Sequence, residues 1–190
     1  MRHKIDYWGS LMSDRLKFIN LTVSDYVNIG LYAFYNSLFL LLIALSTLFL
    51  IQGNFKPEAS FFIFFLLIMF YLTGLLALYG VIKDNKLKRF SGLDETTNMA
   101  IMTTVIGDFF NTHLVYSGDR ILTYYRRATF IRFGIRVVVC FQQKEVLINI
   151  SKFNYFGIKS SFHQPFIDLT THKIIRDFKN KLGETPMISV

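Results

Sequence analysis

Residues 29–51, IGLYAFYNSLFLLLIALSTLFLI, form a stretch of 23 residues without a charge, and residues 61–82, FFIFFLLIMFYLTGLLALYGVI, form a second stretch of 22. A helix rises about 1.5 Å per residue, so each stretch can cross a hydrocarbon layer about 30 Å thick. The first stretch is too long to be the apolar region of a cleaved signal peptide. The sequence therefore predicts a hairpin of two transmembrane helices over residues 29–82.

Basic residues flank this hairpin on one side. Four of them precede the first stretch, and four more lie in residues 83–89, whereas Lys56 is the only one between the two stretches. Loops that carry Lys and Arg usually stay in the cytoplasm. We therefore expect a multi-pass protein of the cell inner membrane with both its N- and C-termini in the cytoplasm.

The N-terminal segment, residues 1–28, has an amphipathic pattern. Its apolar residues recur at helical spacing: Trp8, Leu11, Met12, Leu16 and Ile19. This pattern predicts a short helix, and two placements fit it equally well. The helix lies in the headgroup layer, or it docks on the cytoplasmic domain of the same chain.

The region after the hairpin begins with a predicted connecting helix. Within residues 83–111, Asp94 is a suitable N-cap for an amphipathic helix that ends near Phe110. We expect this helix to couple the membrane hairpin to the domain that follows.

From His113 the apolar residues recur with the period of a strand. The predicted strands are His113–Ser117 and Ile121–Arg126, joined by a tight turn, then a long strand Phe130–Phe141 and its antiparallel partner Glu145–Ser151. A final helix runs from about Leu169 to Leu182, and residues 183–190 form a loose tail. The predicted fold is a membrane α-helical hairpin plus a small cytoplasmic α+β domain with an antiparallel sheet, over residues 112–182.

The positive charge of the chain is concentrated in that domain. Residues 112–182 hold twelve Lys and Arg against four acidic residues, which gives +8, whereas the remainder has nine of each sign. A domain with this balance attracts anions: phosphates of a nucleotide or nucleic acid, anionic lipid headgroups, or an acidic protein.

The candidate ligand-binding residues are arginines of the predicted strands. Arg126, Arg127, Arg132 and Arg136 are expected to converge, because Arg132 and Arg136 share one face of the long strand about 13 Å apart. An arginine fork grips phosphate at two points, and Tyr124 is placed to stack on a base. In the alternative interpretation, this face of the sheet is basic but only solvated.

Within the hairpin, polar residues are few and none is ionisable, which disfavours proton relays and transporters. Asn36 and Ser37 are candidates for lining a pore formed by several copies of the chain. Residues of these types more often make helix-packing contacts. No nucleophile, zinc or phosphate-loop motif is found, so neither an enzyme nor a cofactor or metal is expected.

In its layout, two apolar stretches followed by a basic cytosolic domain, the chain resembles small bacterial antiphage effectors of the CBASS, type III CRISPR and Hailong systems. The resemblance covers the whole chain as architecture and assigns no residue roles. It implies an ion channel or membrane-disrupting homo-oligomer, expected to be a tetramer or larger, with a cytoplasmic sensor domain for nucleotides. Its ligand would be a cyclic or linear oligonucleotide, and its role would be antiviral defence.

A different class of function fits the same features. A membrane-tethered scaffold or immunity protein would bind inner-leaflet anionic lipid or a partner protein through its basic domain, and it would need no oligomer.

Overall fold

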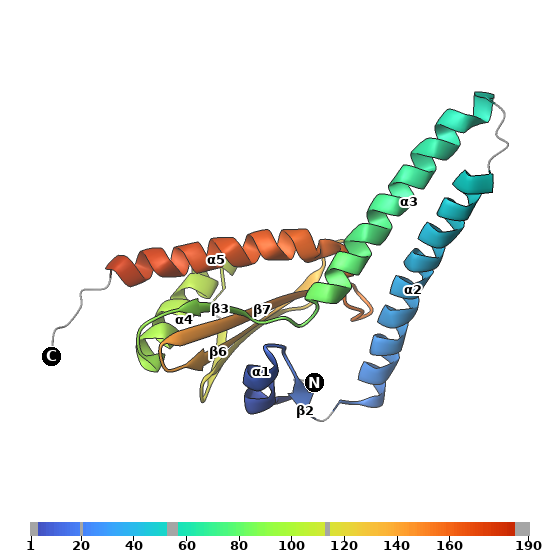
Figure 1. The fold of residues 1–190 in the computed structure, drawn as a ribbon. Coiled ribbons are helices and arrows are strands. Elements are labelled where there is room, and N and C mark those ends of the chain that lie inside the picture. Colours follow the sequence, from blue (N-terminus) through green and yellow to red (C-terminus); the bar gives the residue numbers. More distant parts are fainter. Residues whose placement is uncertain (1–3, 20, 53–56, 113–114, 185–190) are drawn as a thin grey trace. The chain divides into compact units, whose positions relative to one another are not determined.

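The computed structural model describes residues 4–19, 21–52, 57–112 and 115–184, and its chain divides into two compact units. The sheet unit is built from three stretches of chain: up to Leu21, Asn85–Gly157, and from Phe166 onward. The helical-hairpin unit contains Thr22–Asp84 and Ile158–Pro165. Each unit therefore contains segments that are far apart in the sequence (Figure 1).

The sheet unit contains a five-stranded sheet in the order β3-β7-β6-β5-β4, in which all neighbours are antiparallel. The strands are β3 (Lys88–Ser91), β4 (Val115–Gly118), β5 (Ile121–Arg126), β6 (Gly134–Gln142) and β7 (Glu145–Phe153). Side chains alternate between the faces of a strand, and β6 is apolar on both faces over most of its length. Both faces of the sheet therefore need a cover.

Two helices, α4 (Glu95–Phe110) and α5 (Gln164–Glu184), cover one face, which we call the helix face. The side chain of Asp94 caps α4 by accepting a hydrogen bond from the Thr97 amide at 3.0 Å. Phe178 of α5 is fully buried, and its ring meets that of Phe90 edge to face at 5.3 Å. This face holds the larger of the two cores.

The N-terminal segment covers the opposite face. It forms β1 (Lys4–Ile5), α1 (Tyr7–Ser13) and β2 (Phe18–Ile19), and β1 pairs with β2. Leu11 and Leu16 pack on Val138 and Cys140, and Figure 1 shows α1 and α5 on opposite sides of the sheet. Of the two predicted placements, the structure has the helix docked on the chain's own domain. We call this side the α1 face.

The predicted helix of residues 8–19 is shorter than expected. Trp8 and Met12 lie in α1 but are 60% and 87% exposed, whereas Leu16 follows the helix and is buried. The helix ends because Asp14 takes a left-handed conformation with φ of 50°.

Several element boundaries also differ from the prediction. The hairpin of β4 and β5 and helix α4 are confirmed, although residues 113 and 114 lie outside the described residues. β3 was not predicted, and α4 belongs to the core of the sheet unit instead of forming a separate connection. β6 begins at Gly134 instead of Phe130, and α5 begins at Gln164. The predicted tail falls mostly outside the described residues.

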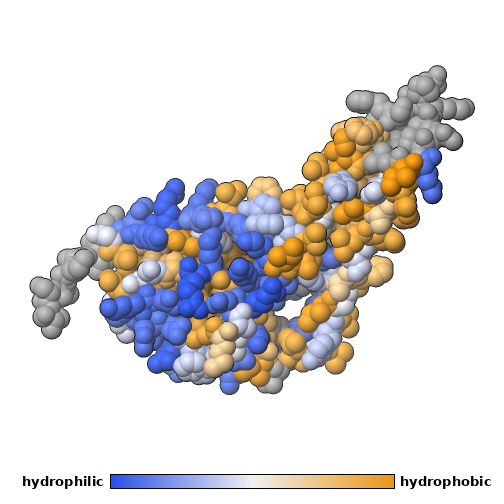
Figure 2. All heavy atoms as spheres, viewed as in Figure 1, coloured by the Kyte–Doolittle hydropathy of each residue, from blue (hydrophilic) through white to orange (hydrophobic). Residues whose placement is uncertain are grey.

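The helical-hairpin unit contains α2 (Val23–Gln52) and α3 (Pro57–Lys83). Both are long and apolar enough to cross a membrane, over Val23–Phe49 and Phe64–Lys83. The two helices pack closely at Gly74, where an added Cβ would lie 2.5 Å from Cγ1 of Ile43. Their outer surface is largely apolar (Figure 2).

A short segment of distant sequence, Ile158–Pro165, packs against both helices in this unit. The Ser161 hydroxyl donates a hydrogen bond to the Asn36 side chain at 2.9 Å, and the Phe162 ring meets that of Phe39 at 4.7 Å. Lys159 forms an ion pair with Asp84. We call Ile158–Pro165 the clamp segment.

Replacing Phe178 by Ala is expected to destabilise the sheet unit by about 3–5 kcal/mol, because it removes a fully buried ring and leaves a cavity. Thermal unfolding of the detergent-solubilised chain measures this change. Leu169→Ala is the control, since Leu169 is 60% exposed on the same helix and its loss should shift the midpoint little. Equal shifts for both variants would contradict the burial of Phe178.

Replacing Gly80 by Ala is expected to displace the clamp segment, because a Cβ at position 80 would overlap the backbone of Ser161. Trypsin should then cleave after Lys159 faster than in the unmodified chain, where Lys159 is ion-paired and largely buried. Gly30→Ala is the matched control, since nothing lies within 4 Å of its added Cβ. Cleavage at the same rate in all three proteins would show that the clamp segment does not rest on Gly80.

Candidate phosphate-binding site

The register of β5 and β6 separates the predicted arginines. Arg126 lies opposite Ile135, and Arg136 lies opposite Tyr125. Directly opposed residues share a face of the sheet, and successive residues alternate. Arg126 therefore lies on the helix face and Arg136 on the α1 face. The predicted convergence is wrong for Arg136, whereas Arg126 and Arg132 do come close together. Arg132 lies before β6 instead of on its face.

Arg136 lies between two aromatic rings on the α1 face. Its guanidinium carbon is 4.4 Å from the centroid of Phe18 and 4.8 Å from that of Phe153. Such cation–π contacts are attractive, and here they join β2 to the end of β7. Arg136 thus helps to attach the N-terminal segment to the sheet.

Tyr124 is not available to a ligand. Its side chain is only 4% exposed, and its ring stacks on Phe110 of α4 with centroids 4.8 Å apart. The predicted base-stacking role of Tyr124 is therefore wrong, because the alternation of β5 directs it into the core beside Leu122. Arg127 follows the end of β5 and is exposed, and its part in binding stays a prediction.

A different set of basic residues comes together on the helix face. Ile135 of β6 is opposed by Arg126 on one side and by Lys152 of β7 on the other, so the two cations flank it. Arg132 lies in the connection from β5 to β6, close enough for its charge to act on Arg126. We call Arg126, Arg132 and Lys152 the cation cluster.

The members of this cluster repel one another. Burial, and then the charge of Arg132, lower the pKa of Arg126. Burial, and then the charge of Arg126, lower the pKa of Lys152. Both shifts mean that the fold disfavours the charged forms of these side chains. Within residues 4–19, 21–52, 57–112 and 115–184, none of the three forms an ion pair, and Nε of Arg126 is buried without a hydrogen-bond acceptor.

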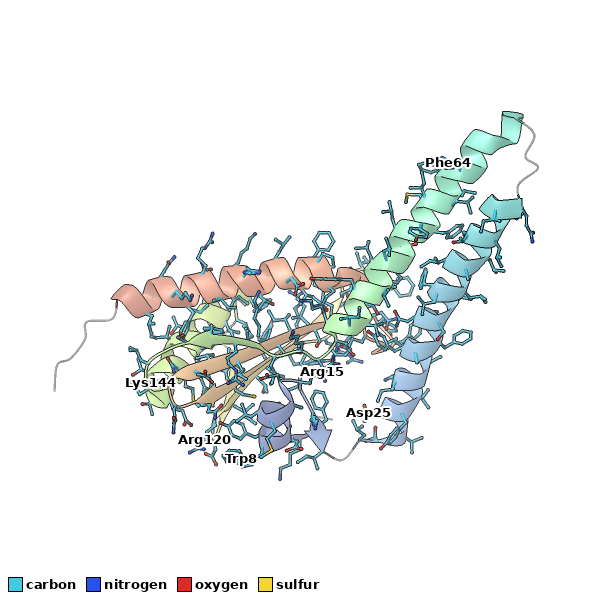
Figure 3. All side chains as sticks on the ribbon, viewed as in Figure 1. Trp8, Arg15, Asp25, Phe64, Arg120 and Lys144 are labelled. Atoms are coloured by element: carbon cyan, nitrogen blue, oxygen red, sulfur yellow. The ribbon has the colours of Figure 1, made fainter. Side chains whose placement is uncertain are left out.

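At the end of the sheet opposite the cation cluster, basic residues form ion pairs. There Arg120, in the turn between β4 and β5, pairs with Glu95 at 3.3 Å, and Arg89 of β3 pairs with Glu145 at 2.7 Å. Figure 3 labels Arg120 and also Lys144, which lies in the turn between β6 and β7 at this same end. Glu95 and Glu145 thus balance charge away from the cation cluster.

The backbone at the cluster is closely packed. An added Cβ at Gly134 would lie 2.9 Å from the amide nitrogen of Ala128 and 3.0 Å from the carbonyl oxygen of Arg126. Any side chain at position 134 would push the start of β6 away from the end of β5. Gly134 therefore sets the spacing between the end of β5, which carries Arg126, and the start of β6.

Sequence reasoning missed Lys152 because the predicted strand ended at Ser151, whereas β7 continues to Phe153. Extending the alternation of Val146, Ile148 and Ile150 by one step would have placed Lys152 on the same face. The sequence does not contain the register that brings it beside Ile135 and Arg126.

The residues predicted to line a pore lie in α2. The side chain of Asn36 donates to the carbonyl of Tyr32 at 2.6 Å and accepts from Ser161 of the clamp segment. Ser37 is exposed on the same helix. In a single chain Asn36 thus fixes the clamp segment, and the lining of a pore by these two residues stays a prediction.

Comparison of the chain with protein-family models, curated proteins and solved structures found no match.

Replacing Arg126 by Gln is expected to raise the pKa of Lys152, because it removes a positive charge that disfavours the protonated amine. Nuclear magnetic resonance of ¹³C-methylated lysine reports this pKa directly. Arg120→Gln is the control and should leave the pKa of Lys152 unchanged, since Arg120 lies at the other end of the sheet. An unchanged pKa in Arg126→Gln would mean that the two cations do not interact.

Proposed function

We propose that the chain is a two-span membrane protein whose cytoplasmic sheet unit binds a phosphorylated ligand at the cation cluster. The ligand is a cyclic or linear oligonucleotide, and its binding controls a homo-oligomer that permeabilises or disrupts the membrane. The observation that carries the proposal is the register that brings Arg126 and Lys152 to either side of Ile135, with Arg132 nearby and no ion pair to any of the three among the described residues.

Two features support the membrane placement. The helices α2 and α3 have the length and apolar character that a bilayer requires, and most of their large apolar side chains are exposed. In addition, residues 4–19, which precede α2, share a core with residues 85–157, which follow α3. If both helices cross the bilayer, the N-terminal end of α2 and the C-terminal end of α3 must therefore lie on the same side of it. This is the arrangement of a two-span hairpin.

The electrostatics support a phosphate ligand. Grouping like charges with partial burial costs free energy, and an anion among them offsets both the repulsion and the lost hydration. Arginine gives phosphate a bidentate contact, while lysine gives it a point charge. An oligonucleotide presents several phosphates, which suits several neighbouring cations.

The connectivity supports a coupling to the helices. Lys152 is followed by Phe153, where β7 ends, and the clamp segment begins only five residues later at Ile158. The clamp segment is held on α2 by Asn36, packs on Gly80 of α3, and pairs with Asp84 directly after α3. A shift of the end of β7 on ligand binding therefore has a short covalent route to both helices.

Replacing Arg126 and Lys152 together by Glu is expected to weaken binding of oligonucleotides at least about 100-fold, since each charge-assisted hydrogen bond contributes about 1.5–3 kcal/mol. Fluorescence anisotropy of a panel of labelled cyclic and linear di- and trinucleotides, with the full chain in detergent, measures the affinity. Arg126→Gln with Lys152→Gln should show the same direction of change with less disturbance of the fold.

The matched control makes the same change in net charge elsewhere. Lys144→Glu with Lys173→Glu reverses two exposed cations outside the cluster and should change the affinity little. An equal loss of affinity in both double variants would show that the basic domain attracts oligonucleotides in general and that the cation cluster is not the binding site. Native mass spectrometry of the unmodified chain tests the oligomer, because a monomer with and without oligonucleotide would contradict the proposed assembly.

A further inference from the structure

Two connections at one end of the sheet carry exposed apolar side chains. Phe130 and Ile131, between β5 and β6, are 89% and 97% exposed, and Tyr155 and Phe156, just after β7, are 58% and 74% exposed. The rings of Phe130 and Tyr155 lie 6.1 Å apart, and those of Tyr155 and Phe156 lie 5.6 Å apart. These four residues form one group, which we call the aromatic tip.

The first connection is a defined turn. The Thr129 amide donates to the carbonyl of Arg132 at 2.8 Å, and the Arg132 amide donates to the Thr129 hydroxyl at 3.1 Å. Phe130 and Ile131 are the two residues between these bonds, so the turn presents them outward. Large apolar side chains grouped on a surface in this way mark a site of contact with a partner or a membrane.

The chain limits how far the aromatic tip can lie from the helical hairpin. Phe156 precedes Ile158, the first residue of the clamp segment, by two positions. Consecutive Cα atoms are about 3.8 Å apart, so these two Cα atoms are separated by no more than about 8 Å. The clamp segment packs beside Gly80 and Asp84, at the end of the apolar span of α3. A connection of two positions therefore tethers Phe156 of the aromatic tip to the segment that packs at that end of α3.

The charge around the aromatic tip suits an anionic surface. No Asp or Glu occurs between Asp119 and Glu145, or between Glu145 and Asp168, and both connections lie within these intervals. Arg127 and Arg132 flank Phe130 and Ile131 in the sequence. Aromatic rings beside basic residues are the composition found where proteins enter the headgroup layer of a bilayer.

We propose that the aromatic tip inserts into the headgroup layer of the same bilayer that holds α2 and α3, with Arg127 facing the phosphates of anionic lipids. The proposal rests on the membrane placement of the proposed function but not on its nucleotide ligand. The tip would fix the orientation of the sheet unit at the membrane surface, so that movement of β7 acts on the clamp segment instead of turning the whole unit.

The test places a single tryptophan in the full chain, in a Trp8→Phe background, reconstituted into nanodiscs of phosphatidylcholine and phosphatidylserine. The tryptophan fluorescence of Ile131→Trp or Phe156→Trp is expected to be quenched when brominated lipids replace the ordinary ones. It is also expected to have its maximum at a shorter wavelength than in the same variant unfolded in denaturant. Leu169→Trp is the control for an exposed apolar position of the sheet unit outside the tip, and it should show neither effect.

Leu45→Trp separates failure of this inference from failure of the membrane placement, because Leu45 is exposed within the span of α2. Quenching at position 45 with no more quenching at 131 and 156 than at 169 would overturn the insertion of the tip and leave the spans in place. A blue shift at 131 without quenching by brominated lipid would also overturn it, since it indicates coverage by protein.

Discussion

The pairing of β6 with both of its neighbours is the constraint on which the sheet unit depends. β6 lies between β5 and β7, and its buried residues serve both cores, with Val137 and Val139 on the helix face and Val138 and Cys140 on the α1 face. A slip of one residue would exchange the two sets. The same alternation assigns each basic residue of the neighbouring strands to a face, so the packing of apolar groups decides where the charges meet.

The positions of the basic residues follow from this register, and the sequence predicts these positions only in part. The sequence correctly predicts the β4–β5 hairpin, the β6–β7 pair and the N-cap Asp94, because these depend on local periodicity and turn chemistry. It does not predict that the sheet unit also takes in the N-terminal segment and residues 85–111, while Ile158–Pro165 belongs to the helical-hairpin unit. It fails for Arg136 and Tyr124, whose surroundings are made by Phe18 and Phe110 from distant segments. It also fails for β3, because an alternation over only four residues is too short to identify a strand without its partner β7.

The strand that was predicted to begin at Phe130 shows why apolar alternation alone can mislead. Phe130 and Ile131 continue the apolar character of the strand, yet Gly134 marks the real start, where β5 and β6 approach too closely for a side chain. The residues before Gly134 are therefore released from the sheet and exposed. A glycine within an apolar run indicates such a close approach, and here it separates the residues that build the core from those that face outward.

The docking of the N-terminal segment also constrains how the protein is made. Leu11 and Leu16 form a core only together with residues of β6 and β7. These strands lie more than a hundred residues later in the chain, after both apolar helices, and are therefore synthesised later. While the ribosome makes the helical hairpin, the apolar side of α1 has no partner sheet to cover it. The core between the N-terminal segment and the sheet can therefore form only after most of the chain has been made.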